Sequence, residues 1–177
     1  MNDHVSRIVE QWRAEEPDLD FDPMLVLARV SRLAKLLERS TEETFGLFGL
    51  AKGGFDVLSA LKRSGPPYRL SPTDLYRSFL ISSGAMTNRI DRLEEAGLVV
   101  RTPDPYDRRA ILVGLTPRGH QLINTAVRAH LANYERILVP LSRSERAVVI
   151  RLLAKLIMPI EAASQPEAEV VEAAQEA

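Results

Sequence analysis

The chain has 177 residues, of which 45% are hydrophobic and 27% are charged, and this composition predicts one folded domain with a sizeable core. It contains no cysteine, which excludes disulfides and thiolate metal sites, and its three histidines lack the spacing of metal ligands. No apolar run approaches the ~18 residues that cross a bilayer, and the N-terminus lacks a signal-peptide core. We therefore expect a cytoplasmic protein with no membrane segment, no metal and no cofactor.

The formal net charge of −1 conceals an uneven distribution of charge along the chain. Residues 1–22 and residues 161–177 are acidic, whereas the segment between them holds 21 of the 23 lysines and arginines. This asymmetry is compatible with an anionic partner for the central segment and with ends that repel such a partner. Charge alone does not separate that interpretation from an ordinary solvated surface.

Hydrophobic periodicity predicts three helices in the first half of the chain. Apolar residues at three- and four-residue spacing indicate an amphipathic helix from Pro23 to about Thr44. A second helix covers FDVLSALKRSG and is expected to end at Gly65, which two prolines follow. A third begins after Ser71, which a proline follows, and Asp74 completes a capping box there.

The stretch from Ile81 to Gly119 changes from a helical period to a strand period. Ser82 or Ser83 is expected to cap a short helix that ends at Gly97 in the left-handed conformation. After it, LVVR and AILVGLT alternate like two short strands, and the residues TPDPYDRR between them favour a turn. This pattern predicts a β-hairpin directly after a helix.

Two longer helices are predicted beyond the hairpin. The first begins at Thr116 and Pro117, and the second opens with a capping box from Ser142 to Glu145. The residues after Glu161 are acidic and are expected to form a mobile tail.

Two short helices at a turn, with a hairpin directly after them, predict a winged helix-turn-helix. The expected fold class is therefore mainly α with a small β-hairpin wing. The second short helix fits a major groove of double-stranded DNA, and an arginine at the hairpin tip suits the neighbouring minor groove. Asp107 is expected to hold the Arg109 side chain through a carboxylate pair, unless the turn is simply polar and solvated. The predicted DNA-contacting residues are Ser83, Ala85, Thr87, Asn88, Arg92, Asp107, Arg108 and Arg109.

Three runs of residues resemble the MarR family of bacterial transcription regulators: TNRIDRLEEAGLV, then DPYDRR, then LTPRG. They are similar to the family's recognition helix, wing and helix-opening signature, and the resemblance covers about Pro23 to Ile160. It implies a homodimer whose terminal helices interdigitate and which represses a neighbouring gene from a pseudo-palindromic operator. One departure is Ala51, where relatives often have a serine or threonine cap.

The resemblance divides the chain into four expected parts. Residues 1–45 form an N-terminal extension and a dimerisation helix, and residues 46–116 form the winged helix-turn-helix. Residues 117–161 form C-terminal dimerisation helices, and residues 162–177 form a disordered acidic tail.

A narrower resemblance is to the urate-responsive subgroup of this family, of the hypothetical uricase regulator and PecS type. The segments that carry it are IVEQW, GFDVLSALKRSGPP, the NRI of the recognition helix and the VVR that enters the wing. It implies that urate or a related purine binds to Trp12, Asp56, Arg63, Arg89 and Arg101. Each residue alone also has an ordinary role, such as a core tryptophan or a buried salt bridge. If Asp56 pairs with Arg89 in the free protein, an anionic ligand disturbs that pair and moves the recognition helix.

Two other functions remain open. The first is a MarR-type repressor that responds to a phenolic or aryl-carboxylate anion, because this family commonly binds such anions. The second is a small enzyme with an anionic substrate, although the sequence has no phosphate-binding loop, nucleophile elbow or cysteine nucleophile. Glu94 and Glu95 are adjacent and point to different sides of a helix, so they do not form a catalytic carboxylate pair. We therefore expect no catalytic residues.

Overall fold

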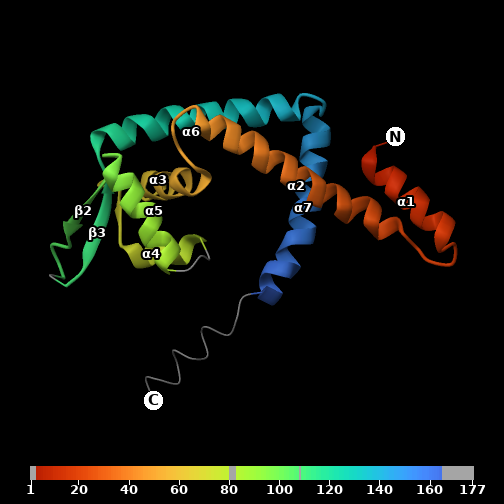
Figure 1. The fold of residues 1–177 in the computed structure, drawn as a ribbon, viewed down its shortest axis with the longest axis horizontal. Helices are drawn as coiled ribbons and strands as arrows, with labels where there is room; N and C mark the ends of the chain where they lie inside the picture. Colours follow the sequence, from red (N-terminus) through yellow and green to blue (C-terminus); the bar gives the residue numbers. More distant parts are fainter. Residues whose placement is uncertain (1–2, 80–82, 108, 165–177) are drawn as a thin grey trace, which may run out of the picture. The chain divides into compact units, whose positions relative to one another are not determined.

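The computed structural model of the chain describes residues 3–79, 83–107 and 109–164. The chain divides into two compact units, Met1–Asn133 and Tyr134–Ala177. Helix α6 (Pro117–Leu138) begins in the first unit and ends in the second, which also holds α7 (Arg143–Ser164) (Figure 1).

Within the described residues, the first unit contains five further helices and three short strands. Helices α3, α4 and α5 lie together beside the β2–β3 hairpin, which confirms the predicted winged helix-turn-helix (Figure 1). The helices are α1 (His4–Glu15), α2 (Asp22–Gly46), α3 (Lys52–Arg63), α4 (Pro72–Phe79) and α5 (Ser83–Glu95), and the strands are β1 (Arg69–Leu70), β2 (Val99–Pro103) and β3 (Ile111–Leu115).

The core of the first unit lies where α3, α4 and α5 meet β3 and the start of α6. Leu58 and Leu61 of α3 and Met86 and Ile90 of α5 are almost completely buried, together with Val113 of β3. Each helical pair is three or four residues apart, and this spacing places both side chains on one helix face. Burial of one such side chain stabilises the fold by roughly 1.5–3 kcal/mol.

The helix ends follow the predicted caps. Ser71 and Asp74 form a capping box at the start of α4, with the Asp74 N–H donating to the Ser71 hydroxyl over 3.1 Å. The Ser71 hydroxyl donates in turn to the Asp74 carboxylate over 2.7 Å. Gly97 ends α5 with a φ of 67°, where glycine has no Cβ to clash. Ala51 occupies the N-cap position of α3 and provides no side-chain hydrogen bond there.

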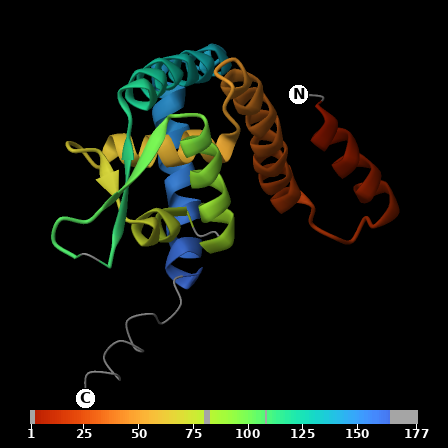
Figure 2. The same cartoon turned by 60° about the vertical axis from the view of Figure 1, so that its left-hand side comes forward.

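The sequence predicted two strands, and the structure adds a third. Strand β1 pairs antiparallel with β3, so that Arg69 faces Gly114 and Leu70 faces Val113. The sheet order is β1-β3-β2, and the β2–β3 hairpin extends away from the helices of the first unit (Figure 2). A strand of two residues has no measurable period, so β1 forms because β3 offers it an edge rather than because of its own sequence.

The base of the hairpin is closed by the residues that open α6. The Thr116 N–H donates to the Leu98 carbonyl over 3.1 Å, and the Thr116 hydroxyl donates to the Gly97 carbonyl over 2.8 Å. The same hydroxyl accepts the Gly119 N–H over 3.0 Å and so caps α6. Gly119 is buried against Leu98, because a methyl group on its Cα would overlap the Leu98 carbonyl oxygen and lie 2.9 Å from the carbonyl carbon. The LTPRG run therefore joins α6 to the turn between α5 and β2.

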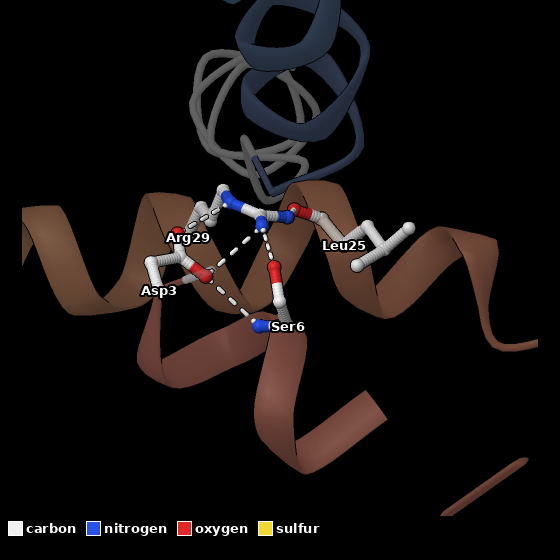
Figure 3. A network of polar contacts seen from close by, with 4 residues as sticks. All are labelled: Asp3, Ser6, Leu25 and Arg29. Carbon is white, nitrogen blue, oxygen red and sulfur yellow. Dashed lines mark hydrogen bonds and ion pairs between the residues drawn. The ribbon is translucent and has the colours of Figure 1, made fainter. Parts of the chain in front are cut away.

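A polar network fastens α1 to α2 (Figure 3). Asp3 caps α1 by accepting the Ser6 N–H over 2.8 Å, and it accepts two bonds from Arg29 of α2 at 2.9 and 3.0 Å. Arg29 also donates to the Ser6 hydroxyl and to the Leu25 carbonyl. The Ser6 backbone bond, followed by the Arg29 bond, lowers the pKa of Asp3 to about 2. The stability that this carboxylate contributes is therefore present above its unfolded pKa and is lost as the pH falls toward about 2.

The second unit carries the predicted capping box at the start of α7. The Glu145 carboxylate accepts the Ser142 N–H over 2.8 Å, and the Ser142 hydroxyl accepts the Glu145 N–H over 3.3 Å. None of the helices in residues 3–79, 83–107 and 109–164 combines the length and the apolar character that spanning a membrane requires. Helix α7 exposes a row of large apolar side chains, namely Val148, Val149, Ile150, Leu152, Leu156, Ile157, Met158 and Ile160.

Candidate DNA interface and ligand site

Helix α5 presents a polar face to solvent and an apolar face to the core. Ala85, Thr87, Asn88 and Arg92 are exposed, where the sequence placed them. Ser83 begins the helix, and its side chain lies outside what the structure describes. A helix with short polar side chains and one arginine on its outer face has the size and chemistry that a major groove accepts.

Arg109 lies exposed at the tip of the hairpin between β2 and β3. The Asp107 carboxylate accepts the backbone N–H of Arg109 over 2.9 Å, and the Asp107 carbonyl accepts the Ala110 N–H over 2.9 Å. Among the described residues, this backbone bond stands in place of the side-chain pair expected between Asp107 and Arg109. Asp107 therefore shapes the turn itself. Arg108, predicted beside it, lies outside the described residues.

Asp56 of α3 is half-buried and lies near four side chains that carry or can carry positive charge. Burial raises the pKa of Asp56 above the usual value of an aspartate, and Lys52, Arg89, Arg63 and His130 each oppose that rise. In the part of the chain that the structure describes, Asp56 and Arg89 form no direct salt bridge, so the pair expected between them is replaced by a longer-range attraction. A half-buried carboxyl group with a raised pKa among cations is typical of functional sites.

Two members of this group, Lys52 and His130, were not predicted from the sequence. Lys52 precedes Asp56 by four residues on α3, a spacing that the sequence does show. Its ammonium pairs with Glu38 of α2 over 3.0 Å, and this contact raises the pKa of Lys52. His130 comes from α6, its ring centroid lies 5.0 Å from that of Phe45, and burial lowers its pKa. Only the fold brings this histidine to Asp56.

An open groove of about 770 Å³ runs between the start of α3 and one side of α5. Its walls include Gly53 on α3 and Asn88, Arg89 and Arg92 on α5. Asn88 and Arg92 belong to the exposed face of α5, whereas Arg89 acts on the Asp56 carboxyl group. The groove therefore borders both the predicted DNA face and the Asp56 group.

The other two predicted ligand residues, Trp12 and Arg101, make contacts elsewhere in the first unit. Trp12 of α1 is 47% exposed, and its ring stacks on Phe21 with a centroid distance of 5.9 Å. The Arg101 guanidinium on β2 pairs with Asp91 and Glu94 of α5, and the Arg101 N–H donates to Glu94 over 2.9 Å. The backbone bond and then the guanidinium lower the pKa of Glu94. The structure thus groups three of the five predicted ligand residues and shows these two in other contacts.

Comparison with known proteins identifies the family. Residues 50–110 match the MarR family. Over 152 residues the chain is 41% identical to the HTH-type transcriptional regulator PecS of Dickeya dadantii (strain 3937), across 86% of this chain and 92% of PecS. The chain belongs to the MarR family. The resemblance seen in the recognition helix, the wing and the LTPRG run is therefore confirmed.

Two solved structures show the same winged-helix fold as this MarR-family chain. A mutant of MarR from E. coli, complexed with operator DNA, has a TM-score of 0.65 at 24% identity, across 78% of this chain and 99% of that chain. BpsR of Bordetella bronchiseptica, whose DNA binding is regulated by 6-hydroxynicotinic acid, has a TM-score of 0.63 at 27% identity, across 74% and 91%. The relatives are transcriptional regulators and not enzymes, which removes the alternative of a small enzyme. The chain is a transcriptional regulator of the MarR type.

Proposed function

We propose that this regulator is a homodimer that represses transcription from a pseudo-palindromic operator and releases the DNA when urate or a related purine binds. The observation that carries this proposal is the position of α5. Its outer face exposes Asn88 and Arg92, while Arg89 lies in the groove and acts on Asp56. One short helix thus borders both the DNA-reading surface and the candidate ligand group. A ligand that displaces Arg89 therefore changes the helix that reads DNA.

Exposed apolar faces support the homodimer. Isolated apolar side chains on a surface are common, but a contiguous row along a helix marks a protein–protein contact. Helix α7 has such a row, and α2 has another. In a dimer, a second copy of this chain covers both rows, and the two copies present two α5 helices to successive major grooves. The exposed apolar residues of α2 are Val26, Leu27, Val30, Leu33 and Leu36, between 40% and 59% exposed.

The chemistry of urate suits the five predicted ligand residues. Urate is a flat monoanion at neutral pH, so the Trp12 indole covers its face and the three arginines supply charged N–H donors. Asp56 is the exception, because a carboxylate beside an anion is repelled. Its raised pKa helps it to accept a proton, and otherwise it moves away from the ligand and takes its attraction for Arg89 with it. The coupling is reciprocal, so operator DNA weakens urate binding by the same factor.

A second candidate effector is a phenolic or aryl-carboxylate anion. Arg101 is already engaged by Asp91 and Glu94, and it has to leave those carboxylates before it can contact urate. A smaller aromatic acid needs only Arg63 and Arg89, which the fold already places near Asp56. The regulation of BpsR by 6-hydroxynicotinic acid favours the same class of effector.

An operator gel shift with titrated effectors tests both candidates. The DNA is the region upstream of the gene for this protein, and the effectors are urate, xanthine, salicylate and 6-hydroxynicotinic acid. Release by urate or xanthine at lower concentration than by the two aryl acids supports the purine proposal. Release by the aryl acids alone supports the second candidate, and absence of any shift with DNA contradicts the proposed function.

The wing tip gives a prediction for DNA affinity. Arg109→Ala is expected to weaken operator binding by about tenfold or more, and to reduce the slope of log affinity against log salt by about one. The melting temperature is expected to stay within about 1 °C of wild type, because a hairpin tip adds little to the core. Tyr106→Ala is the control, since Tyr106 is a neutral side chain of the same tip and is 98% exposed. Unchanged affinity and slope in Arg109→Ala would exclude contact between this arginine and DNA.

Asp56 gives a prediction that separates ligand binding from DNA release. Asp56→Asn keeps the shape of the side chain and removes the charge that an anionic ligand repels, so urate is expected to bind at least as tightly as to wild type. Release is expected to need about tenfold more urate, because the coupling to Arg89 is lost. Trp12 fluorescence measures binding, and an operator gel shift measures release. Asp18→Asn, at an exposed carboxylate, is the control. If both titrations shift together in Asp56→Asn, Asp56 does not transmit the signal.

A further inference from the structure

Gly53 stands in the first turn of α3, against Arg89 of α5. A methyl group on the Gly53 Cα would lie 2.5 Å from the Nε of Arg89, 2.6 Å from its Cζ and 3.0 Å from its Cδ. Ordinary van der Waals contact between heavy atoms needs about 3.5–4.0 Å. The guanidinium therefore fills the space that the Cβ of any other residue at position 53 requires.

Glycine at this position weakens the helix that contains it. Glycine has a lower helix propensity than any residue except proline, and α3 begins with Gly53 and Gly54 after Ala51, which provides no side-chain cap. Gly54 is also close to α5, because a methyl group on it would lie 3.4 Å from the Leu93 side chain. The weak start of α3 therefore coincides with a close approach of α5.

The contact between Gly53 and Arg89 lies where the proposed signal has to pass. Both residues line the groove, and Arg89 acts on Asp56, which is three residues after Gly53 on α3. On the other side, Asn88 is adjacent to Arg89 in the sequence and is exposed on the face of α5 that we assign to DNA. A shift of the guanidinium away from α3 therefore changes how α5 sits on the first turn of α3.

We propose that Gly53 is a positioning residue that seats the Arg89 guanidinium on α3 and thereby sets the orientation of α5 for DNA. The consequence for DNA rests on the proposed function, whereas the seat is a property of the fold alone. Any side chain at position 53 moves Arg89, and a ligand that moves Arg89 has the same effect as that substitution.

A double-mutant cycle tests the proposal on the full chain. Gly53→Ala is made in wild type and in Arg89→Ala, and the four proteins are compared by melting temperature at equal concentration and by operator affinity without effector. In wild type, Gly53→Ala is expected to lower the melting temperature by about 2–4 °C and operator affinity by about tenfold. In the Arg89→Ala protein it is expected to raise the melting temperature, because the gain in helix propensity is no longer opposed, and to leave operator affinity unchanged.

Gly46→Ala is the matched control, since Gly46 is also helical and a methyl group there meets nothing within 4 Å. Its effect is expected to be the same in both backgrounds. If Gly53→Ala shifts the melting temperature equally in both backgrounds, in either direction, the seat is wrong. If the melting temperatures reverse but operator affinity falls equally in both backgrounds, the DNA role of the seat is wrong. If wild type itself does not bind operator, the proposed function fails, and the melting temperatures still decide the seat.

Discussion

Gly119→Ala is expected to lower the free energy of unfolding by about 3 kcal/mol or more. The added methyl group would overlap the Leu98 carbonyl oxygen, which also accepts the Thr116 N–H. This oxygen belongs to the backbone and not to the free end of a flexible side chain, so the turn between α5 and β2 has to move. The wing and the start of α6 both depend on that turn. Urea unfolding followed by circular dichroism measures the loss.

Gly46→Ala again provides the comparison, with an expected change within about 1 kcal/mol of wild type. The two variants make the same chemical change in a helix and differ in what the methyl group meets. A Gly119→Ala protein as stable as Gly46→Ala would mean that α6 does not begin against Leu98.

Leu33→Glu is expected to abolish dimerisation and operator binding together. Leu33 is 50% exposed in the single chain, so the charge costs the isolated chain little. In the proposed dimer the same position is covered, and an unpaired buried charge costs several kcal/mol. A cost of about 4 kcal/mol raises the dimer dissociation constant by roughly a thousandfold. Sedimentation at micromolar concentration measures the assembly, and an operator gel shift measures its consequence.

Lys35→Glu is the matched control for that substitution. Lys35 is exposed on the same helix, and the helical period places it on the side opposite the apolar row. It is expected to remain a dimer that binds operator. If Leu33→Glu also sediments as a dimer with normal operator affinity, the apolar row of α2 is not the dimer interface.

The predicted elements agree with the structure where local chemistry determines them. Periodic apolar positions determine the long helices, and side-chain caps determine where α4 and α7 begin. Gly97 ends α5 for an equally local reason, its positive φ. Strand β1 was missed because its two residues adopt a strand only through pairing with Gly114 and Val113 of β3. Nothing in the sequence near Arg69 indicates that partner.

The candidate site was predictable only in part, for the same reason. The exposed row of α5 follows from the helical period alone. The surroundings of Asp56 do not, because His130 arrives from α6 through tertiary packing. The partners of Arg101 were visible in principle, since Asp91 and Glu94 are three residues apart and share one face of α5. The sequence analysis considered Glu94 only beside its neighbour Glu95, where no shared face exists.

The closed base of the wing makes its tip a replaceable part. The Thr116–Leu98 bond joins the points where the hairpin leaves and re-enters the domain, and a second bond, from the Asp104 N–H to the Ala110 carbonyl over 3.0 Å, closes the far end of the ladder. Whatever lies between Asp104 and Ala110 is attached to a finished scaffold. Insertions or exchanges there leave the core contacts intact. Natural variation, or a designer who seeks a new operator preference, can therefore alter this segment without rebuilding the domain that carries it.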